Sequence, residues 1–433
     1  MRLIQPVLLF HHHIMWQVPE RDMMNIDELT GMGEPLLGEY RQKGILKARA
    51  EDFIVEEIPS MIPEDRDGRY TVFSAVLKNW DTNRFVSYLA RKLGISKERI
   101  SYAGTKDKRG ITKQFFSIDG EYDLSQVVIQ DVTIDMVFRS NRKLELGMLE
   151  GNRFIVGLGP DIDSRSVLLS LEKMEQIGGF PNYFGIQRFG SVRVNTHRIG
   201  ELIVRGRYED AVLLYLYDPL FDTEDYRVNF HETMDARRAL REYPLHLNFE
   251  RSLLGYIAEK GRIEGAFDVF PRNLRMLFIH AFQSYLFNRI LAKRIELLGS
   301  LNGIVEGDTV VEVDRLFNRS GKEVVVNSFN MGQIRSEIAA DRMRPVIKLF
   351  GYRTAFSAGS MGEIEREVLG DIKQENFKIP GHRDMWSSGD TRITSSRARD
   401  FQIRDDSTFS FSLGRGMYAT VFLREIFDLN PIS

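Results

Sequence analysis

The stretch "AGTKDKRGITKQFF", residues 103–116, predicts two strands joined by a highly charged loop. The phrases "ERISYAG" and "ITKQFFSI" are typical of short strands, and the loop between them runs from Gly104 to Gly110. One acid, Asp107, stands there among four cations: Lys106, Lys108, Arg109 and Lys113. Loops at the edge of a sheet often carry functional side chains. Asp107 therefore has two interpretations: a surface salt bridge, or an acid kept ionised for chemistry on an anionic substrate.

The first third of the chain alternates expected strands with one or two helices. Strand patterns occur around "DFIVEEI", "TVFSAVLKN", "VTIDMVF", "KLELGML" and "NRFIVGL". The segment "NRFVSYLARKLG" predicts a helix with one apolar stripe, capped by Asp81 or Thr82 and ended by Gly94. This mixture predicts an α+β fold.

After the first third, the spacing of the apolar residues changes to a helical periodicity, as in "RNLRMLFIHAFQSYLFNRILAKRIELLG". The segment "GHRDMWSSGDTRITSS", residues 381–396, has the composition of an exposed loop, and the tail after it resembles the first third. We therefore expect a helix-rich insertion at 180–385 within a host formed by 26–179 and 386–433. Residues 1–25 lack periodicity and are interpreted as an appendage.

The composition limits the classes of protein to which this chain can belong. A chain of 433 residues with 43% hydrophobic and 28% charged residues is typical of a soluble protein of two or three domains. It has no apolar run of about eighteen residues that would cross a membrane. The absence of cysteine excludes disulfides, thiolate catalysis and cysteine-ligated metals. These features favour the cytoplasm.

The net charge of -2 does not indicate a nucleic-acid partner, but the basic residues are clustered. Local patches decide phosphate binding, although any one cluster is more often a solvated surface. The clusters are 41–49, 139–143, 237–241, 288–294 and 392–404.

Common catalytic motifs are absent. The loop at 104–110 lacks the lysine of a phosphate-binding P-loop, because Ile111 takes that position. The phrase "DRDG" at 65–68 lacks the glutamate of a calcium loop. Neither a zinc-protease motif nor a serine-hydrolase motif occurs, so we expect no metal.

Seven phrases, in this order, resemble the tRNA pseudouridine synthase D (TruD) family. They cover most of the chain from about residue 38 onward: "LKARAEDFIVEE", "LKNWDTNRFVSYLARKLGI", "ISYAGTKDKRGITKQ", "LELGMLEGNRFIVGL", "PNYFGIQRFG", "HAFQSYLFNRILAKR" and "GRGMYATVFLREI". The resemblance implies a pseudouridine synthase catalytic domain with a mixed, largely antiparallel sheet and helices, interrupted by a family-specific insertion. It also implies action on a uridine at position 13 of tRNA.

The resemblance also implies roles for individual residues. Asp107 takes the place of the catalytic aspartate and Lys47 that of its lysine partner. Asn152 matches the asparagine that holds the aspartate, and Phe154 the ring that stacks on the target base. Gln114 and Thr112 match neighbours of the catalytic loop and would support the site. Contacts with RNA are expected from Lys106, Lys108, Arg109 and Arg188.

The chemistry suits these residue types. A carboxylate can act as nucleophile or base, and a nearby cation keeps it ionised. An extruded uridine costs a few kcal/mol to unstack, and a stack on an aromatic ring returns roughly 1–3 kcal/mol. The isomerisation exchanges no electrons, so we expect no cofactor, with tRNA as the partner and no protein partner. Two alternatives remain: an idle RNA-binding or chaperone module of this fold, and a uridine glycosylase.

Overall fold

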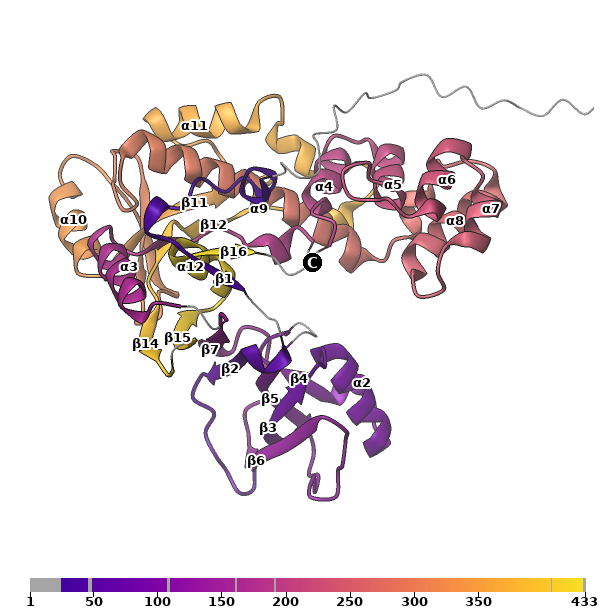
Figure 1. The fold of residues 1–433 in the computed structure, drawn as a ribbon, viewed down its shortest axis with the longest axis horizontal. Helices are drawn as coiled ribbons and strands as arrows, with labels where there is room; N and C mark the ends of the chain where they lie inside the picture. The colour runs from indigo at the N-terminus through magenta and orange to yellow at the C-terminus, as the bar shows by residue number, and fades with distance from the viewer. Residues whose placement is uncertain are drawn as a thin grey trace, which may run out of the picture. The chain divides into compact units, whose positions relative to one another are not determined.

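The computed structural model describes residues 25–45, 49–106, 110–159, 162–190, 192–405 and 407–430 (Figure 1). Their contacts divide them into two compact units. The sheet unit contains 31–188, 283–378 and 386–430, and the helical unit contains 25–30, 189–282 and 379–385. Each unit is described separately below.

The sheet unit is built on an eight-stranded sheet in which only one pair of strands is parallel. Seven strands follow the order β14-β15-β7-β2-β5-β3-β6, and β4 pairs with β5. The parallel pair is β2 with β5, at the centre of the sheet. The bounds are β2 (Phe53–Pro59), β3 (Tyr70–Lys78), β4 (Ile100–Tyr102), β5 (Ile111–Asp119), β6 (Val132–Ser140), β7 (Leu149–Gly157), β14 (Arg399–Ile403) and β15 (Thr408–Gly414).

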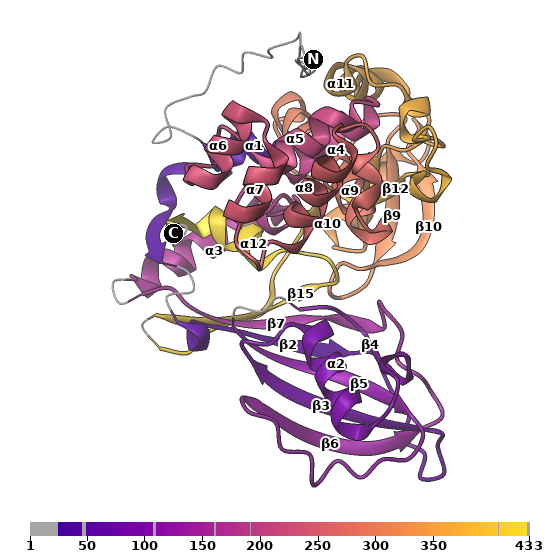
Figure 2. The ribbon, with the colours of Figure 1, turned by 90° about the vertical axis from the view of Figure 1, so that its right-hand side faces the viewer.

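One face of this sheet is covered by α2 (Thr82–Leu93), as Figure 2 shows. The side chain of Asp81 caps the helix by accepting from the N–H of Arg84 at 2.9 Å, and Gly94 ends it in a left-handed conformation. Both features confirm the expected helix and its ends. The apolar stripe packs on Phe73 and Phe116 of the sheet, which makes this face the apolar core of the region.

Three smaller sheets and several helices complete the sheet unit. A four-stranded sheet has the order β10-β9-β11-β12, β1 pairs in parallel with β16, and β13 pairs with β8. The bounds are β1 (Gln42–Ile45), β8 (Phe180–Pro181), β9 (Thr309–Val313), β10 (Arg319–Val325), β11 (Met343–Leu349), β12 (Asp390–Ile393), β13 (Ser395–Ser396) and β16 (Phe427–Asn430). The helices are α3 (Ser164–Gln176), α10 (Met331–Ala339), α11 (Gly359–Leu369), α12 (Ala419–Ile426), and the short η2 (Gly38–Tyr40), η3 (Ala50–Asp52), η4 (Lys97–Arg99), η5 (Ile186–Arg188) and η7 (Gln374–Phe377).

The helical unit contains helices and no strand among its described residues. Its elements are α1 (Ile26–Thr30), α4 (Thr196–Val204), α5 (Tyr208–Leu216), α6 (Asp225–Thr233), α7 (Ala236–Glu242), α8 (Asn248–Lys260), η6 (Ala266–Val269), η8 (Arg383–Met385) and the first part of α9 (Arg272–Leu298).

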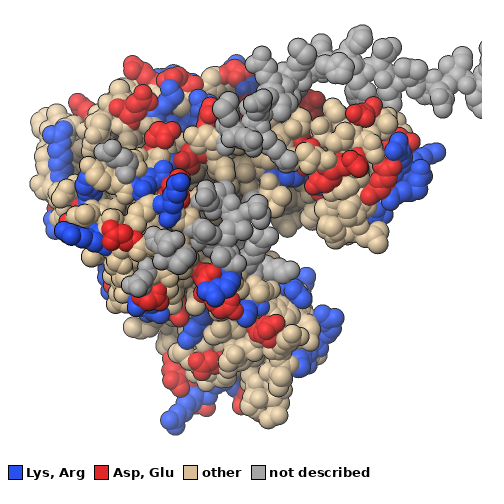
Figure 3. All heavy atoms as spheres, viewed as in Figure 1, with Lys and Arg blue, Asp and Glu red and all other residues tan. Residues whose placement is uncertain are grey.

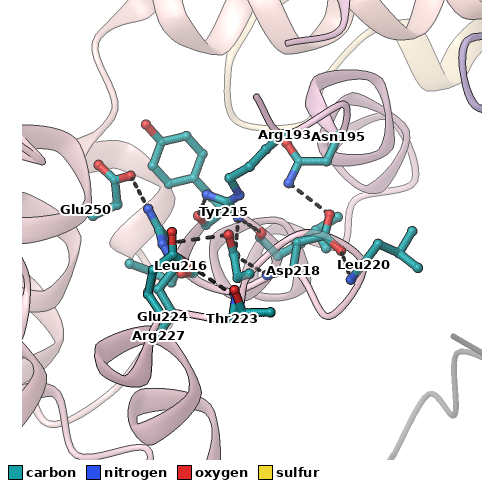
Figure 4. Close-up of polar contacts among 12 residues, drawn as sticks. Arg193, Asn195, Tyr215, Leu216, Asp218, Leu220, Thr223, Glu224, Arg227 and Glu250 are labelled. Atoms are coloured by element: carbon teal, nitrogen blue, oxygen red, sulfur yellow. Dashed lines mark hydrogen bonds and ion pairs between the residues drawn. The ribbon is translucent and has the colours of Figure 1, made fainter. Parts of the chain in front are cut away.

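A buried network of ion pairs joins the helices of this unit (Figure 4). Arg227 lies between Asp222 at 3.7 Å and Glu250 at 3.1 Å, and all three are largely buried. Arg193 contacts Asp222 from the other side at 3.0 Å. Asp218 accepts from Asn195 at 2.9 Å and from Arg198 at 2.7 Å. Removing one member would leave a buried charge unpaired, so these residues have a structural role.

The predicted α+β class, with a mixed and largely antiparallel sheet, is confirmed. Two local predictions were wrong. Residues 143–148 form a turn before β7, in which the N–H of Gly147 donates to Ala103 O at 2.7 Å. The expected exposed loop at 381–396 contains β12 and β13, and its residues 394–396 are fully buried.

The domain limits inferred from the sequence remain a proposal. Residues 189–282 and 379–385 of the expected insertion fall in the helical unit, whereas 283–378 pack with the sheet unit. Among the described residues, no helix combines the length and the apolar character needed to cross a membrane.

Candidate active site

Both ends of the segment that carries Asp107 are fixed by hydrogen bonds. On one side, the N–H of Lys106 donates to Thr82 Oγ1 at 2.9 Å. On the other, the N–H of Asn79 donates to Gly110 O at 3.0 Å. Residues 107–109 lie outside the described residues, so the positions of Asp107, Lys108 and Arg109 stay predictions. These two hydrogen bonds nevertheless place Lys106 and Gly110, which flank the segment, next to β5 and the start of α2.

A buried ion pair holds the first anchor. Lys106 Nζ lies 2.7 Å from Glu57 Oε1, and the two side chains are 10% and 1% exposed. The second carboxylate oxygen of Glu57 accepts from the N–H of Phe115 at 2.9 Å. Lys106 was predicted to contact RNA. The structure gives it a protein partner that fixes the loop, and a contact with RNA stays a prediction.

Gln114 links the same loop to α2. Its Oε1 accepts from Thr82 Oγ1 at 3.1 Å, and its Nε2 donates to Gly104 O at 3.1 Å. Thr82 therefore donates to Gln114 while it accepts from Lys106. Gln114 is fully buried, so its role here is to position the loop.

Strand register brings four predicted site residues onto one face of the sheet. Val55 of β2 pairs with Thr112 of β5 on one side and with Phe154 of β7 on the other. Side chains alternate between the two faces along a strand. Gln114 and Asn152, each two residues from one of these positions, therefore lie on the same face. It is the face that α2 covers nearby.

Phe154 belongs to a row of aromatic rings on that face. Its ring centroid lies 5.5 Å from that of Phe411, in a stacked arrangement, and 6.1 Å from that of Phe53. The ring centroid of Phe411 in turn lies 4.6 Å from that of Phe422 of α12. Phe154 is 7% exposed, so one side of its ring is already used in the core. Stacking on a base stays a prediction and would use the remaining edge or face.

Two of the predicted residues carry buried polar atoms that have no hydrogen-bond partner among the described residues. These atoms are Thr112 Oγ1 and Asn152 Oδ1. Leaving such a group unsatisfied costs about 1–3 kcal/mol, and native proteins rarely do so without a reason. Both atoms lie on the face that carries Gln114 and Phe154, which makes this face the candidate site.

The chain matches the model of the family "tRNA pseudouridine synthase D (TruD)" over residues 35–426. The chain belongs to the TruD family. It is 46% identical, over 88% of its length, to the probable tRNA pseudouridine synthase D of Picrophilus torridus, of which it covers 93%. For the corresponding protein of Thermoplasma acidophilum the identity is 45%, over 89% of this chain and 93% of that protein.

The TruD fold is seen in a solved structure as well. The crystal structure of the putative tRNA pseudouridine synthase D of Methanosarcina mazei superposes with a TM-score of 0.77 at 33% identity. The match covers 96% of this chain and 99% of that one. Family membership therefore rests on both sequence and fold.

Lys47, expected to pair with Asp107, lies outside the described residues, between β1 and η3. Its pairing stays a prediction. Among the residues that the structure does describe, no group of three or more His, Asp or Glu side chains is arranged to hold a metal ion.

Arg188 lies apart from the four residues of the sheet face, in η5. Its Nε donates to Ser284 Oγ at 3.0 Å, and its guanidinium carbon lies 5.7 Å from the ring centroid of Phe184. Burial lowers the pKa of Arg188, and the nearby Tyr418 raises it in smaller part. The structure thus places Arg188 beside α12 rather than beside Thr112.

The basic clusters seen in the sequence are neutralised in part. Arg294 forms a buried pair with Asp308 at 2.6 Å, and Arg399 pairs with Asp341 at 2.9 Å. On the face shown in Figure 3, Lys and Arg are interspersed with Asp and Glu. The cluster 237–241 lies on α7, where its three arginines are exposed. Local sequence therefore overestimates the free positive charge.

Sequence reasoning missed Glu57 and Thr82 as parts of the site. A signal for Glu57 was present, because Phe53, Val55 and Glu57 alternate along β2 and share its buried face. A carboxylate at an inward position of a strand needs a buried partner. Thr82 gave only the signal of a helix start, and its contact with the loop depends on the tertiary fold.

Proposed function

We propose that this chain is a tRNA pseudouridine synthase that isomerises a uridine of tRNA, at position 13, to pseudouridine. The observation that carries the proposal is membership of the TruD family over residues 35–426. The geometry adds support, since the loop that carries Asp107 is anchored next to a sheet face with two polar atoms that have no partner among the described residues.

The reaction breaks the bond between ribose C1′ and uracil N1, turns the detached base and forms a bond between C1′ and C5. The proton lost from C5 is balanced by one gained at N1, so product and substrate have the same composition. Asp107 would supply the carboxylate, as nucleophile toward the ribose or as base. Lys47 would keep it ionised, because a nearby cation lowers the pKa of a carboxyl group.

The sheet face would hold the base while it is detached. Asn152 can donate or accept through its amide, and Thr112 through its hydroxyl, without changing the charge of the site. Phe154 would contact the base in the predicted stack, which returns part of the cost of flipping. A buried, fixed platform suits this task because the base must not diffuse away.

The test is incubation of the enzyme with unmodified tRNA transcript, followed by chemical mapping of pseudouridine at single-nucleotide resolution. We expect one modified site, at position 13, and unchanged RNA mass. The variant Asp107→Asn should bind tRNA as the wild type does and form no product. Product formation by Asp107→Asn would remove Asp107 from its role. Abasic RNA would indicate a glycosylase, and binding without product by the wild type would indicate an idle RNA-binding module.

A further inference from the structure

Two arginines of the sheet unit, Arg188 and Arg392, have no carboxylate partner among the described residues. This distinguishes Arg392 of β12 from its neighbours in the basic cluster 392–404, since Arg397 and Arg399 both pair with Asp341. Arginines that are partly buried are normally paired, because burial of an unpaired charge is costly. The pair therefore calls for a functional explanation.

The two guanidinium groups lie over one aromatic ring, that of Phe184. The guanidinium carbon of Arg392 is 4.2 Å from its centroid and that of Arg188 is 5.7 Å. Both distances are within the range of a cation–π contact. The backbone of Phe184 is fixed by Asn288, whose Oδ1 accepts its N–H at 2.8 Å and whose Nδ2 donates to its carbonyl at 2.9 Å. The ring is thus a fixed platform that both cations contact.

Protein groups use only part of each guanidinium. Arg392 Nε donates to Asn182 O at 3.0 Å, and its Nη2 donates to Asn182 Oδ1 at 2.6 Å and to Gly416 O at 2.9 Å. Arg188 donates through Nε to Ser284 Oγ. The Nη1 group of Arg392 and both Nη groups of Arg188 are left with donors that no described protein atom accepts, and none of them is fully buried. Fixed, unused donors of this kind suit a tetrahedral oxyanion.

The electrostatic repulsion between the two cations also favours the binding of an anion. Burial lowers the pKa of Arg392 to about 10; the Tyr418 hydroxyl acts against this, and the charge of Arg188 lowers the pKa further. Among the described residues, no carboxylate contributes to the electrostatic environment of either arginine. An anion bound to both arginines would offset the cost of burying their charges and the repulsion between them.

α12 connects this pair to the candidate active site. At the start of the helix, Thr420 Oγ1 donates to Gln187 Oε1 at 3.2 Å, next to Arg188 in the chain. Two residues later, Phe422 contacts Phe411, which stacks on Phe154. A continuous series of side-chain contacts through α12 therefore links the segment that carries Arg188 to the sheet face.

We propose that Arg188 and Arg392 together bind one backbone phosphate of the tRNA substrate, on the platform of Phe184. This inference rests on the proposed function for the identity of the RNA. The phosphodiester supplies one negative charge and two free oxygens, one for each guanidinium. The contact fixes the strand without reading its sequence.

The test is the dependence of tRNA affinity on salt, measured by fluorescence anisotropy between 50 and 200 mM KCl. Each phosphate contact contributes roughly 0.7–0.9 to the slope of log affinity against log salt. The variants Arg188→Gln and Arg392→Gln should each lower the slope by about that amount. The double variant should lose little more, because the two residues share one phosphate. Arg188→Lys should keep the slope, because it keeps the charge.

A matched control is Arg69→Gln. Arg69 is paired with Asp119 through two hydrogen bonds, so its replacement changes the net charge equally without removing a free cation. Its slope should equal that of the wild type. Thermal unfolding of every variant shows whether the fold is intact, and Arg188→Lys keeps the test valid if Arg392→Gln is unstable. Equal slopes for the wild type and Arg188→Gln would overturn the proposal.

The source of the phosphate is tested separately with inorganic phosphate. Millimolar phosphate should compete with tRNA for the wild type and not for Arg188→Gln. Competition together with an unchanged RNA slope would assign the site to a free anion and overturn the tRNA contact. Failure of the proposed function is distinguishable, because it appears as absent pseudouridine with the wild type, whatever the slopes of the variants.

Discussion

Glu57 and Lys106 form a buried ion pair, with 2.7 Å between Oε1 and Nζ, directly before the loop that carries Asp107. Glu57 also accepts the backbone N–H of Phe115, so one carboxylate joins β2, β5 and the loop. Breaking a buried pair costs more than the pair contributes, since the remaining charge stays in the interior.

We expect Glu57→Gln to lower the free energy of unfolding by about 3 kcal/mol, because Lys106 is left buried and unpaired. Lys106→Met alone should cost a similar amount. The double variant Glu57→Gln/Lys106→Met should cost clearly less than the sum, since no charge is left behind. Urea titration followed by circular dichroism measures all four proteins. Strict additivity would show that the two side chains are not coupled.

Thr112→Val should separate stability from activity. The hydroxyl of Thr112 is buried and has no hydrogen-bond partner in the part of the chain that the structure describes, so the nearly isosteric valine should leave the melting temperature unchanged or raise it. We expect kcat to fall about tenfold, because a hydrogen bond to the bound base or to Asp107 is lost. Initial rates of pseudouridine formation measure this.

The control for this variant is Ser410→Ala. Ser410 of β15 also carries a buried hydroxyl that no described residue contacts by a hydrogen bond. It is adjacent to Phe411, so it faces the opposite side of the sheet. Its removal should affect neither rate nor KM. Equal rates for the wild type and Thr112→Val would exclude the hydroxyl from the reaction.

Gly110→Ala should damage the loop anchor. Gly110 has a φ of +123°, and an added Cβ would lie 2.6 Å from Phe53 O. Gly94 also has a positive φ, of +66°, but nothing lies within 4 Å of its added Cβ. Gly94→Ala should therefore cost about 1 kcal/mol of stability at constant activity. Gly110→Ala should cost more and reduce kcat as well. Equal effects of the two substitutions would contradict the role assigned to Gly110.

The stability of the helical unit should depend on His197 below neutral pH. Burial on α4 lowers the pKa of His197 to about 3, and the charge of Arg198 contributes in smaller part. The unfolded chain, with a pKa near 6.5, binds a proton that the folded chain does not. Its contribution to stability is therefore present above pH 6.5 and is lost as the pH falls toward 3.

At pH 5 this loss amounts to about 2 kcal/mol relative to pH 8. The variant His197→Gln has no histidine at this position and does not show this loss. The difference in unfolding free energy between the wild type and His197→Gln should therefore shrink as the pH falls from 8 to 5. Guanidinium titrations at several pH values provide the comparison, in which other titrating groups cancel. Parallel pH profiles would show that His197 is accessible to protons in the folded state.

Local sequence predicts the elements whose signals are local. The helix α2 follows from its apolar stripe, from Asp81 and from Gly94, and β2 follows from its alternation. The α+β class follows from the same patterns. The wrong strand at 143–148 shows the limit, because alternation there competes with a turn in which Gly147 has a φ of +91°.

The candidate site depends on information that no single segment contains. Thr112, Asn152 and Glu57 meet only through the register of β2 between β5 and β7, over separations of many tens of residues. Arg392 belongs to the basic cluster 392–404 that the sequence shows, but its position beside Arg188 was not predictable for the same reason. Its segment has a loop-like composition, and only pairing with β11 and the ring of Phe184 give it a fixed position.

β15 and β16 lie more than 250 residues after the strands that they complete: β15 pairs with β7, and β16 pairs with β1. During synthesis, the row of rings that contains Phe154 therefore lacks Phe411 until the ribosome has passed β15. Until then, a nascent chain would expose this apolar face. Copies that are terminated before β15 thus lack a completed platform, and they should be substrates for chaperones and proteases.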